Sequence, residues 1–428
     1  MIKFVISLGE HLTKHLPMKF LKVKTSIVIN YFLFGILLNS VGTVILQTQR
    51  YYHISASKVS ILEACKDLSI AAVSFIVASF ITKIGYKKSM QLALFFVTAI
   101  CFVVPSLKTY LAIKLLFVIT GASFALVKIS VFGTIGLITI NEKEHLSLMN
   151  FIESFFMIGI LSGYFLFSYF IEDTNAASDK WFKFYYLIGA LYALAWLLLT
   201  SSTLDESAAK VGDSDLRQSL LQMLKLLTYP FIISFILCAF LYVLVEQSIM
   251  SWLPTFNNKV LHLPSTYSVL IASVLAAATA FGRFSAGFTL KRASWLPTLI
   301  VCLASASALV LIAMPWANTT SNTTISSWKD IPMVAYIFPL IGFFLAPIYP
   351  VINSLVLAAL PKNRHGAMSG LIVVFSALGG TLGSFITGNI FESYGGTTAF
   401  YFSLLPIIAL CLSLFLFKKF RSENLITQ

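Results

Sequence analysis

Twelve apolar segments constrain the fold of this chain more than any other feature of its sequence. They lie at approximately 25–49, 59–82, 89–107, 111–140, 146–171, 183–203, 229–256, 265–290, 295–316, 331–360, 366–393 and 397–417. An apolar helix of about 20 residues spans the hydrocarbon core of a bilayer, and a spanning backbone must satisfy its polar groups internally. We therefore predict an all-α membrane protein with twelve transmembrane helices.

The composition excludes a soluble protein, and the charge pattern predicts a topology. Hydrophobic residues make up 58% of the 428 residues and charged residues 11%, too few for a soluble surface. If the N-terminus lies inside, the cytoplasmic segments hold 19 basic residues and the outer segments seven. Because Lys and Arg collect in cytoplasmic loops, we predict that both termini are cytoplasmic. The net charge of +13 then reflects topology, and no nucleic-acid partner is predicted.

No motif indicates an enzyme, a metal or a cofactor. The five cysteines all fall in predicted spans, without a CxxC pair or a histidine cluster, so neither a disulfide framework nor a metal site is predicted. A glycine-rich phosphate loop is also missing, which argues against an ATP-driven pump. Short loops and the absence of a targeting signal favour a bacterial inner membrane.

A charged connection divides the chain into two halves of six spans each. The predicted units are a basic N-terminal segment, the first half, a cytoplasmic linker, the second half and a cytoplasmic tail, at 1–24, 25–203, 204–228, 229–417 and 418–428. Residues 1–24 are either an interfacial amphipathic helix or a loose basic tail. Similar small-residue motifs, Gly159-xxx-Gly163 and Gly379-xxx-Gly383, occur in the fifth and eleventh spans. We therefore predict pseudo-symmetric halves around a central cavity.

Ionisable side chains inside the apolar spans are the first candidates for function, because they are expensive in hydrocarbon. They are Glu63, Lys66, Asp67, Lys114, Lys128, Glu153, Glu246 and Arg283. With a rise of about 1.5 Å per residue, Asn39, Lys128, Glu246 and Tyr349 lie roughly 21–27 Å along their helices from one end. This depth is near the middle of the membrane, where transporters bind their solutes.

Glu246 is predicted to couple proton movement to solute binding, since a midplane carboxyl can be protonated and released. The alternative is a structural hydrogen bond to a neighbouring helix. Lys128 is too deep to reach the interface easily, so we expect either contact with an anionic solute or a static ion pair with Glu153. Both interpretations stay open.

The remaining charges are expected nearer the membrane surfaces. Glu63, Lys66 and Asp67 share one helix face within about two turns of the outer end, and are predicted to form an outer-vestibule charge cluster. Arg283 lies nearer the inner end of its span and is expected to serve a gate or a structural pair.

The chain as a whole resembles the major facilitator superfamily, whose members join two six-helix halves by a cytoplasmic loop. Thr82-Lys83-Ile84-Gly85-Tyr86-Lys87-Lys88 is similar to the short basic gating loop of that superfamily, with Thr82 in place of the usual acid. Gly282-Arg283 with Lys291-Arg292 is similar to its repeat at the end of the eighth span. The resemblance implies that Lys87, Lys88 and Arg283 act in gating.

Three shorter segments resemble the fucose permease group of sugar–proton symporters. They are Phe240-Leu241-Tyr242-Val243 leading to Glu246 and Ser251-Trp252-Leu253, Tyr349-Pro350-Val351-Ile352-Asn353-Ser354-Leu355, and Asn150-Phe151-Ile152-Glu153. The group match implies that Tyr349, Asn353 and Trp252 contact the solute. Lys128 occupies the region where that group carries an acid.

These observations predict a secondary active transporter that works by alternating access. The expected solute is a small polar molecule, a sugar or an organic anion, moved by proton-coupled symport. The expected partners are the solute, protons and the lipid bilayer, and the expected state is a monomer. The alternative is an exporter of siderophores or drug-like compounds, although the deep charges favour a polar or anionic solute.

Overall fold

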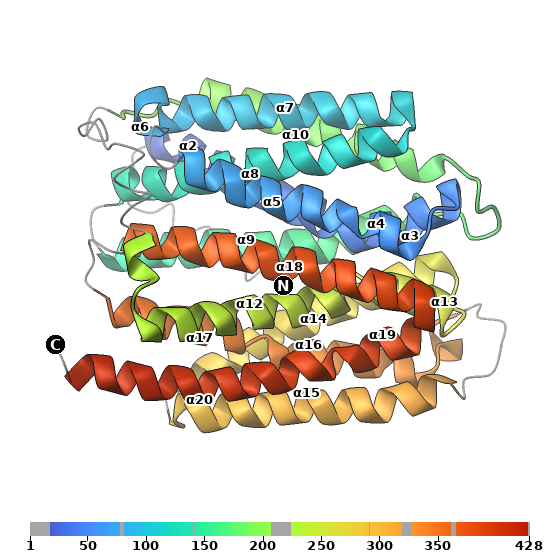
Figure 1. The fold of residues 1–428 in the computed structure, drawn as a ribbon. Helices are drawn as coiled ribbons and strands as arrows, with labels where there is room; N and C mark the ends of the chain where they lie inside the picture. Colours follow the sequence, from blue (N-terminus) through green and yellow to red (C-terminus); the bar gives the residue numbers. More distant parts are fainter. Residues whose placement is uncertain are drawn as a thin grey trace.

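The computed structural model is all-helical over the part of the chain that it describes (Figure 1). The described residues are 18–77, 81–139, 142–206, 224–290, 292–318, 327–360 and 365–426. Most of the N-terminal segment and residues 207–223 of the linker lie outside these ranges. The all-α prediction is therefore confirmed, while the predicted unit boundaries stay predictions.

The first half contains six spans, and the first two are each built from two consecutive helical pieces. In chain order the elements are α2 (Met18–Asn39), α3 (Val41–Tyr52), α4 (Ala56–Val59), α5 (Ile61–Val77), α6 (Ile81–Ile84), α7 (Tyr86–Leu107), α8 (Tyr110–Ile138), α9 (Glu142–Ser168), η1 (Lys180–Phe182) and α10 (Lys183–Ser201). The first span is α2 with α3, and the second is α4 with α5. One residue, Ser40 or Ser60, separates the two pieces in each case.

The second half repeats this order of six spans. Its elements are α12 (Pro230–Met250), α13 (Leu253–Lys259), α14 (Ser265–Thr289), α15 (Trp295–Asn318), η3 (Trp328–Asp330), η4 (Met333–Tyr336), α16 (Ile337–Leu345), α17 (Ile348–Ala358), α18 (His365–Tyr394), α19 (Gly396–Phe402) and α20 (Leu404–Ile426). The seventh span is α12 with α13, and the tenth is α16 with α17. Pro347, at the start of α17, separates the pieces of the tenth span because proline lacks the N–H that would continue the ladder.

Eleven helices of the described chain are long and apolar enough to cross a membrane by length and composition. The second predicted span is the remaining one. Its main helix, α5, has 17 described residues and carries Glu63, Lys66 and Asp67. The twelve-helix prediction is therefore consistent with the structure. The second span falls outside the eleven because it is short and carries three charged residues.

Equivalent helices pack together in the two halves. The first and fifth spans pair as α2 on α9, and the seventh and eleventh pair as α12 on α18. The predicted small-residue motifs lie at these two contacts. A Cβ added at Gly163 would lie 3.2 Å from the Cα of Ile36, and one at Gly383 would lie 3.0 Å from the Cα of Leu244. Small residues let the helix backbones approach closely, as the motif predicted.

The two halves meet along two helix pairs, which are also equivalent by pseudo-symmetry. The second span packs against the eleventh as α5 on α18, and the eighth packs against the fifth as α14 on α9. We call these contacts the α5–α18 seam and the α9–α14 seam. The end of the bundle where α10 ends and α12 begins is called the linker end, and the opposite end, with α3, α4, α13 and α19, the far end (Figure 1).

Candidate functional site

The second half gathers tyrosines around Glu246, the residue predicted to couple protons. The Tyr242 hydroxyl donates to Oε1 of Glu246 at 2.7 Å. The guanidinium of Arg283 places Nη2 3.8 Å from the same oxygen. The rings of Tyr242 and Tyr349 stack with centroids 5.4 Å apart and an interplanar angle of 22°. Glu246 therefore has both a hydrogen-bond donor and a counter-ion.

The tenth and eleventh spans extend this group. The Tyr349 hydroxyl lies 2.8 Å from the Ser376 hydroxyl on α18, and the Asn353 side chain interacts with the same tyrosine. Oδ1 of Asn353 is buried and has no hydrogen-bond partner within the described part of the chain. Tyr349 and Asn353, predicted from the resemblance, thus lie in one polar group with Glu246.

Arg283 crosses the α9–α14 seam. Its Nη1 lies 3.7 Å from Sδ of Met157 on α9, while its side chain is 39% exposed. Glu153, one helical turn before Met157, is exposed and close enough to interact electrostatically with Arg283. An acid of the first half and a base of the second half therefore face the same space between the halves.

Lys128 lies among aromatic rings rather than against a carboxylate. Its ammonium lies 5.8 Å from the ring centre of Phe124 and 5.9 Å from that of Phe132, a cation–π arrangement. Phe124 in turn stacks on Phe156 of α9 at 5.7 Å. No ion pair joins Lys128 to Glu153 among the described residues. In this structure the static pair is not formed, and the ammonium is available to another partner.

Glu63, Lys66 and Asp67, which we call the α5 triad, do not line an open vestibule as predicted. Their exposed fractions are 0%, 6% and 9%, because α5 packs against α8 on one side and α18 on the other. Lys66 pairs with Glu63, and its Nζ lies 3.4 Å from Oδ1 of Asp67. Ser251, in the second half, donates to Oε2 of Glu63 at 2.8 Å. The triad is a buried element of the α5–α18 seam.

Trp252 also differs from the prediction of solute contact, whereas the prediction for Asn39 stays a prediction. Trp252 is 0% exposed, and its Nε1 donates to the carbonyl and the hydroxyl of Ser384 at 3.1 Å each. These hydrogen bonds connect the break between α12 and α13 to α18. Asn39 is half-buried, and its amide donates to the carbonyl of Gly35 in its own helix at 3.1 Å.

The basic loop predicted to gate makes its contacts inside the first half. Lys87 donates from Nζ to the carbonyls of Ser202 and Thr200 at 2.6 and 3.1 Å, at the end of α10. Glu206, just after α10, accepts the backbone N–H groups of Tyr86 and Lys87 at 2.8 and 2.7 Å. A carboxylate is favourable at a helix N-terminus, so Glu206 supplies an acid that Thr82 does not. Lys88 is exposed.

Sequence reasoning missed a set of polar contacts that join the halves at the far end. Arg50 donates to the Ser265 hydroxyl of the second half at 2.6 Å and to the Asp173 carbonyl of the first half at 3.1 Å. The Asp173 carboxylate in turn accepts the Thr266 N–H of the second half at 3.0 Å. Lys259 donates to Oε1 of Gln49 at 2.7 Å. The Ser57 N–H donates to Glu392 at 2.9 Å. These contacts close the far end, and their partners are 93 to 335 residues apart in the sequence.

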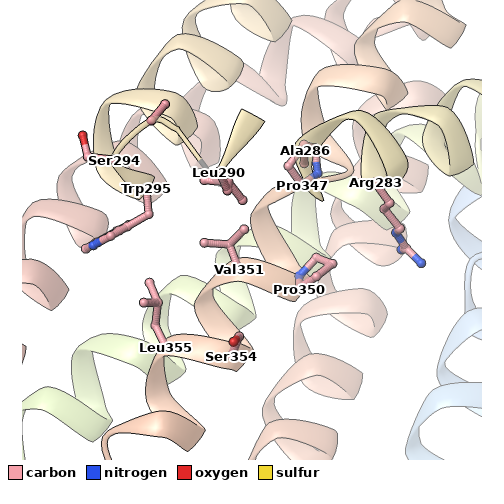
Figure 2. Close-up of a pocket in the computed structure, with 11 residues that line it drawn as sticks. Arg283, Ala286, Leu290, Ser294, Trp295, Pro347, Pro350, Val351, Ser354 and Leu355 are labelled. Atoms are coloured by element: carbon pink, nitrogen blue, oxygen red, sulfur yellow. The ribbon is translucent and has the colours of Figure 1, made fainter. Parts of the chain in front are cut away.

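A cavity of about 540 Å³ lies between α14, α15 and α17 in the second half (Figure 2). Its lining is mostly apolar, with Leu290, Trp295, Val351 and Leu355 among the residues drawn. Arg283 lies at one end of the cavity and extends away from it, while Trp295 and Leu355 line the opposite end (Figure 2). The charge of Arg283 is thus directed toward the α9–α14 seam and not into this cavity.

Comparisons with known proteins agree with this architecture. The protein TsgA homolog of Buchnera aphidicola subsp. Baizongia pistaciae is 24% identical over 376 residues, which cover 86% of this chain and 88% of that protein. A solved nucleoside transporter superposes with a TM-score of 0.72 at 14% identity, covering 94% of this chain and 99% of the other. The E. coli fucose:proton symporter gives a TM-score of 0.61 at 15% identity, covering 94% and 99%. At these identities the solved structures establish the fold.

The family model for the Major Facilitator Superfamily matches residues 27–380. This range extends from the first span into the eleventh and includes both seams. The resemblance stated from the sequence is confirmed at the level of the superfamily, and a fucose permease is among the proteins of similar fold. The chain therefore belongs to the Major Facilitator Superfamily and is a membrane transporter rather than an enzyme.

Proposed function

We propose that this transporter moves a small polar solute, a sugar or an organic anion, by proton-coupled symport across a bacterial inner membrane. Both termini and the linker are placed in the cytoplasm by the distribution of Lys and Arg. The far-end contacts between Arg50, Ser265 and Asp173 then close the outer side. The structure in this view is the arrangement that is shut to the outside.

One observation carries the choice of solute class. Charges of both signs from both halves meet around the α9–α14 seam, with Glu246 and Arg283 contributed by the second half and Glu153 by the first. Lys128 lies beside Phe124, which stacks on Phe156 of α9, three residues after Glu153. Ionisable groups at membrane depth mark solute or proton routes, and the aromatic rings beside them suit a ring-shaped or amphipathic solute.

The experiment that tests the solute class is counterflow with purified protein in proteoliposomes, using a panel of neutral sugars, nucleosides, sugar acids and small carboxylates. We expect the best solute to carry a carboxylate or phosphate, because Lys128 lies among aromatic rings and has no carboxylate partner among the described residues. Preference for lipophilic cations or neutral drugs would contradict the proposal and favour the exporter alternative. Uptake that ignores an imposed proton gradient would contradict symport.

Two matched variants then locate the contact. Lys128→Gln should weaken binding of an anionic solute roughly tenfold or more, since loss of a charge-assisted hydrogen bond costs about 1.5–3 kcal/mol. Glu153→Gln should leave that affinity unchanged or raise it, because it removes a like charge. If both single variants are unstable and the double variant is rescued, Lys128 and Glu153 form a structural pair in another state of the cycle, and the anion proposal fails.

A further inference from the structure

The α5 triad contains one more acid than base, in a place where charge is expensive. Glu63 and Asp67 contribute two carboxylates and Lys66 one ammonium, all at least nine-tenths buried. With every group in its ordinary charge state the triad carries a net charge of −1. A buried charge that is not compensated is strongly unfavourable. Binding of one proton would make the triad neutral.

The contacts show which carboxylate is the less compensated. Glu63 pairs with Lys66 through Oε1 and accepts the Ser251 hydroxyl at Oε2. Asp67 has only the longer 3.4 Å approach of Lys66 to Oδ1. Its Oδ2 faces Gly380 of α18, where an added Cβ would lie 2.5 Å away. The excess charge therefore falls on Asp67.

Among the described side chains of the surrounding helices, no cation other than Lys66 offsets the charge of Asp67. From α9, Tyr164 faces Lys66 and Glu63, and from α12, Glu246 adds a further negative charge near Asp67. The contact from α18 is Gly380, which has no ionisable side chain. On α8, Lys114 lies over the Tyr110 ring at 4.9 Å. Glu246 differs from Asp67 because Arg283 and Tyr242 compensate it.

We propose that Asp67 holds a proton when the far end is closed, and that the α5 triad, rather than Glu246, is the group that carries the coupled proton. Oδ2 of Asp67 takes the proton from a hydronium ion, leaving water, a neutral carboxylic acid and the Lys66–Glu63 pair. When α5 and α18 separate, water reaches Asp67 and the proton can leave. The triad draws partners from both halves, so its protonation is linked to their approach. The coupling role rests on the symport proposed above.

The test is an infrared titration of the purified protein without solute, following the carbonyl stretching band of protonated carboxyl groups. We expect the wild-type protein to show such a band at neutral pH. Asp67→Asn should abolish it, because the remaining Glu63–Lys66 pair is neutral. Glu206→Gln, a control at the linker end and outside both seams, should keep the band. An unchanged band in Asp67→Asn, or its loss in Glu206→Gln, would overturn the proposal.

A second measurement does not depend on a variant that folds. Wild-type protein with isotopically labelled aspartate carboxyl carbon should show the same band shifted to lower frequency. A band that does not shift would assign the proton to a glutamate and overturn the proposal. Failure of symport gives a different result, namely solute uptake that ignores the proton gradient while the aspartate band is present. The two proposals can therefore fail separately.

Discussion

The two seams between the halves occupy equivalent positions, but their ionisable side chains differ in solvent exposure. At the α5–α18 seam the side chains of Glu63, Lys66 and Asp67 are 0%, 7% and 12% exposed, because helix packing covers most of the triad. At the α9–α14 seam Arg283 keeps 39% of its side-chain surface and Glu246 keeps 17%. The α5–α18 and α9–α14 contacts are therefore equivalent by pseudo-symmetry but differ in how far they expose their charges. In the proposals above, the buried seam holds the proton and the more exposed seam contacts the solute.

The difference follows from where small residues lie. Gly380 and Gly388 on α18 face Asp67 and the Ala56 carbonyl, so α18 approaches α4 and α5 closely. At the other seam, α14 presents Arg283 and α9 presents Met157. Its glycine, Gly282, faces Phe343 inside the second half instead. Long side chains hold the α9–α14 seam apart and leave polar groups accessible.

The largest expected effect comes from removing the base of the buried seam. Lys66→Ala leaves two buried carboxylates without a counter-ion, which costs about 3–5 kcal/mol for a buried pair. Arg283→Ala, its counterpart in the open seam, should cost about 0–1 kcal/mol because water screens an exposed pair. Thermal unfolding in detergent at neutral pH measures both. Equal losses of melting temperature would break the comparison.

A smaller loss is expected when the buried seam is overfilled. Gly380→Val places methyl groups against Asp67, and overpacking of this kind costs about 1–3 kcal/mol. Gly136→Val is the control, since a Cβ at Gly136 meets nothing within 4 Å. In the same thermal assay, we expect a lower melting temperature for Gly380→Val and an unchanged one for Gly136→Val. An unaffected Gly380→Val protein would show that α18 can move away from α5 at little cost.

Next in size is the loss of one hydroxyl donor to a carboxylate in each seam. Ser251→Ala removes the donor to Glu63, and a hydrogen bond to a charged group contributes about 1.5–3 kcal/mol. Tyr242→Phe removes the donor to Glu246, where water can replace it because the carboxylate is partly exposed. We expect Ser251→Ala to be the more destabilised protein. The reverse order would mean that Glu246 is the less hydrated acid.

The smallest loss of stability is expected from a change of Trp252, whose indole connects the break between α12 and α13 to α18 by hydrogen bonds. Trp252→Phe loses the bond from Nε1 to Ser384, a neutral hydrogen bond contributing about 0.5–1.5 kcal/mol. Trp181→Phe is the control, since Nε1 of Trp181 is buried without a partner among the described residues. Chemical unfolding should separate the two variants. A Trp252→Phe protein as stable as wild type would show that the hydrogen bond from Trp252 to Ser384 does not stabilise the buried seam.

The fold could be read from the sequence because apolar length and small-residue spacing are local properties. Gly159-xxx-Gly163 and Gly379-xxx-Gly383 predicted two close helix contacts, and both are present. The grouping of Tyr349 and Asn353 near Glu246 followed from short motifs. The depth of a residue along its helix is also a local property, and the prediction that Glu246 lies near mid-membrane rests on it.

The burial of the α5 triad could not be predicted in the same way. Depth gives the position of Asp67 along the membrane normal but not the direction of its side chain around the helix, which depends on Gly380 of a helix more than 300 residues away. Trp252 was misassigned for the same reason. The far-end contacts of Arg50 and Lys259 use ordinary polar residues in loops and helix ends, and no local pattern distinguishes them.

The breaks in the first and seventh spans have a mechanical consequence. α2 ends at Asn39 and α12 at Met250, and the two breaks touch, since a Cβ at Gly42 would lie 2.8 Å from the Ser251 carbonyl. Beyond them α3 and α13 form short arms of about 18 and 10 Å, from a rise of about 1.5 Å per residue. Such arms can pivot at their bases while the longer helices stay in place. We expect the far end to open when α3 and α13 bend together at these two touching breaks. This movement displaces fewer residues than rotation of the whole halves.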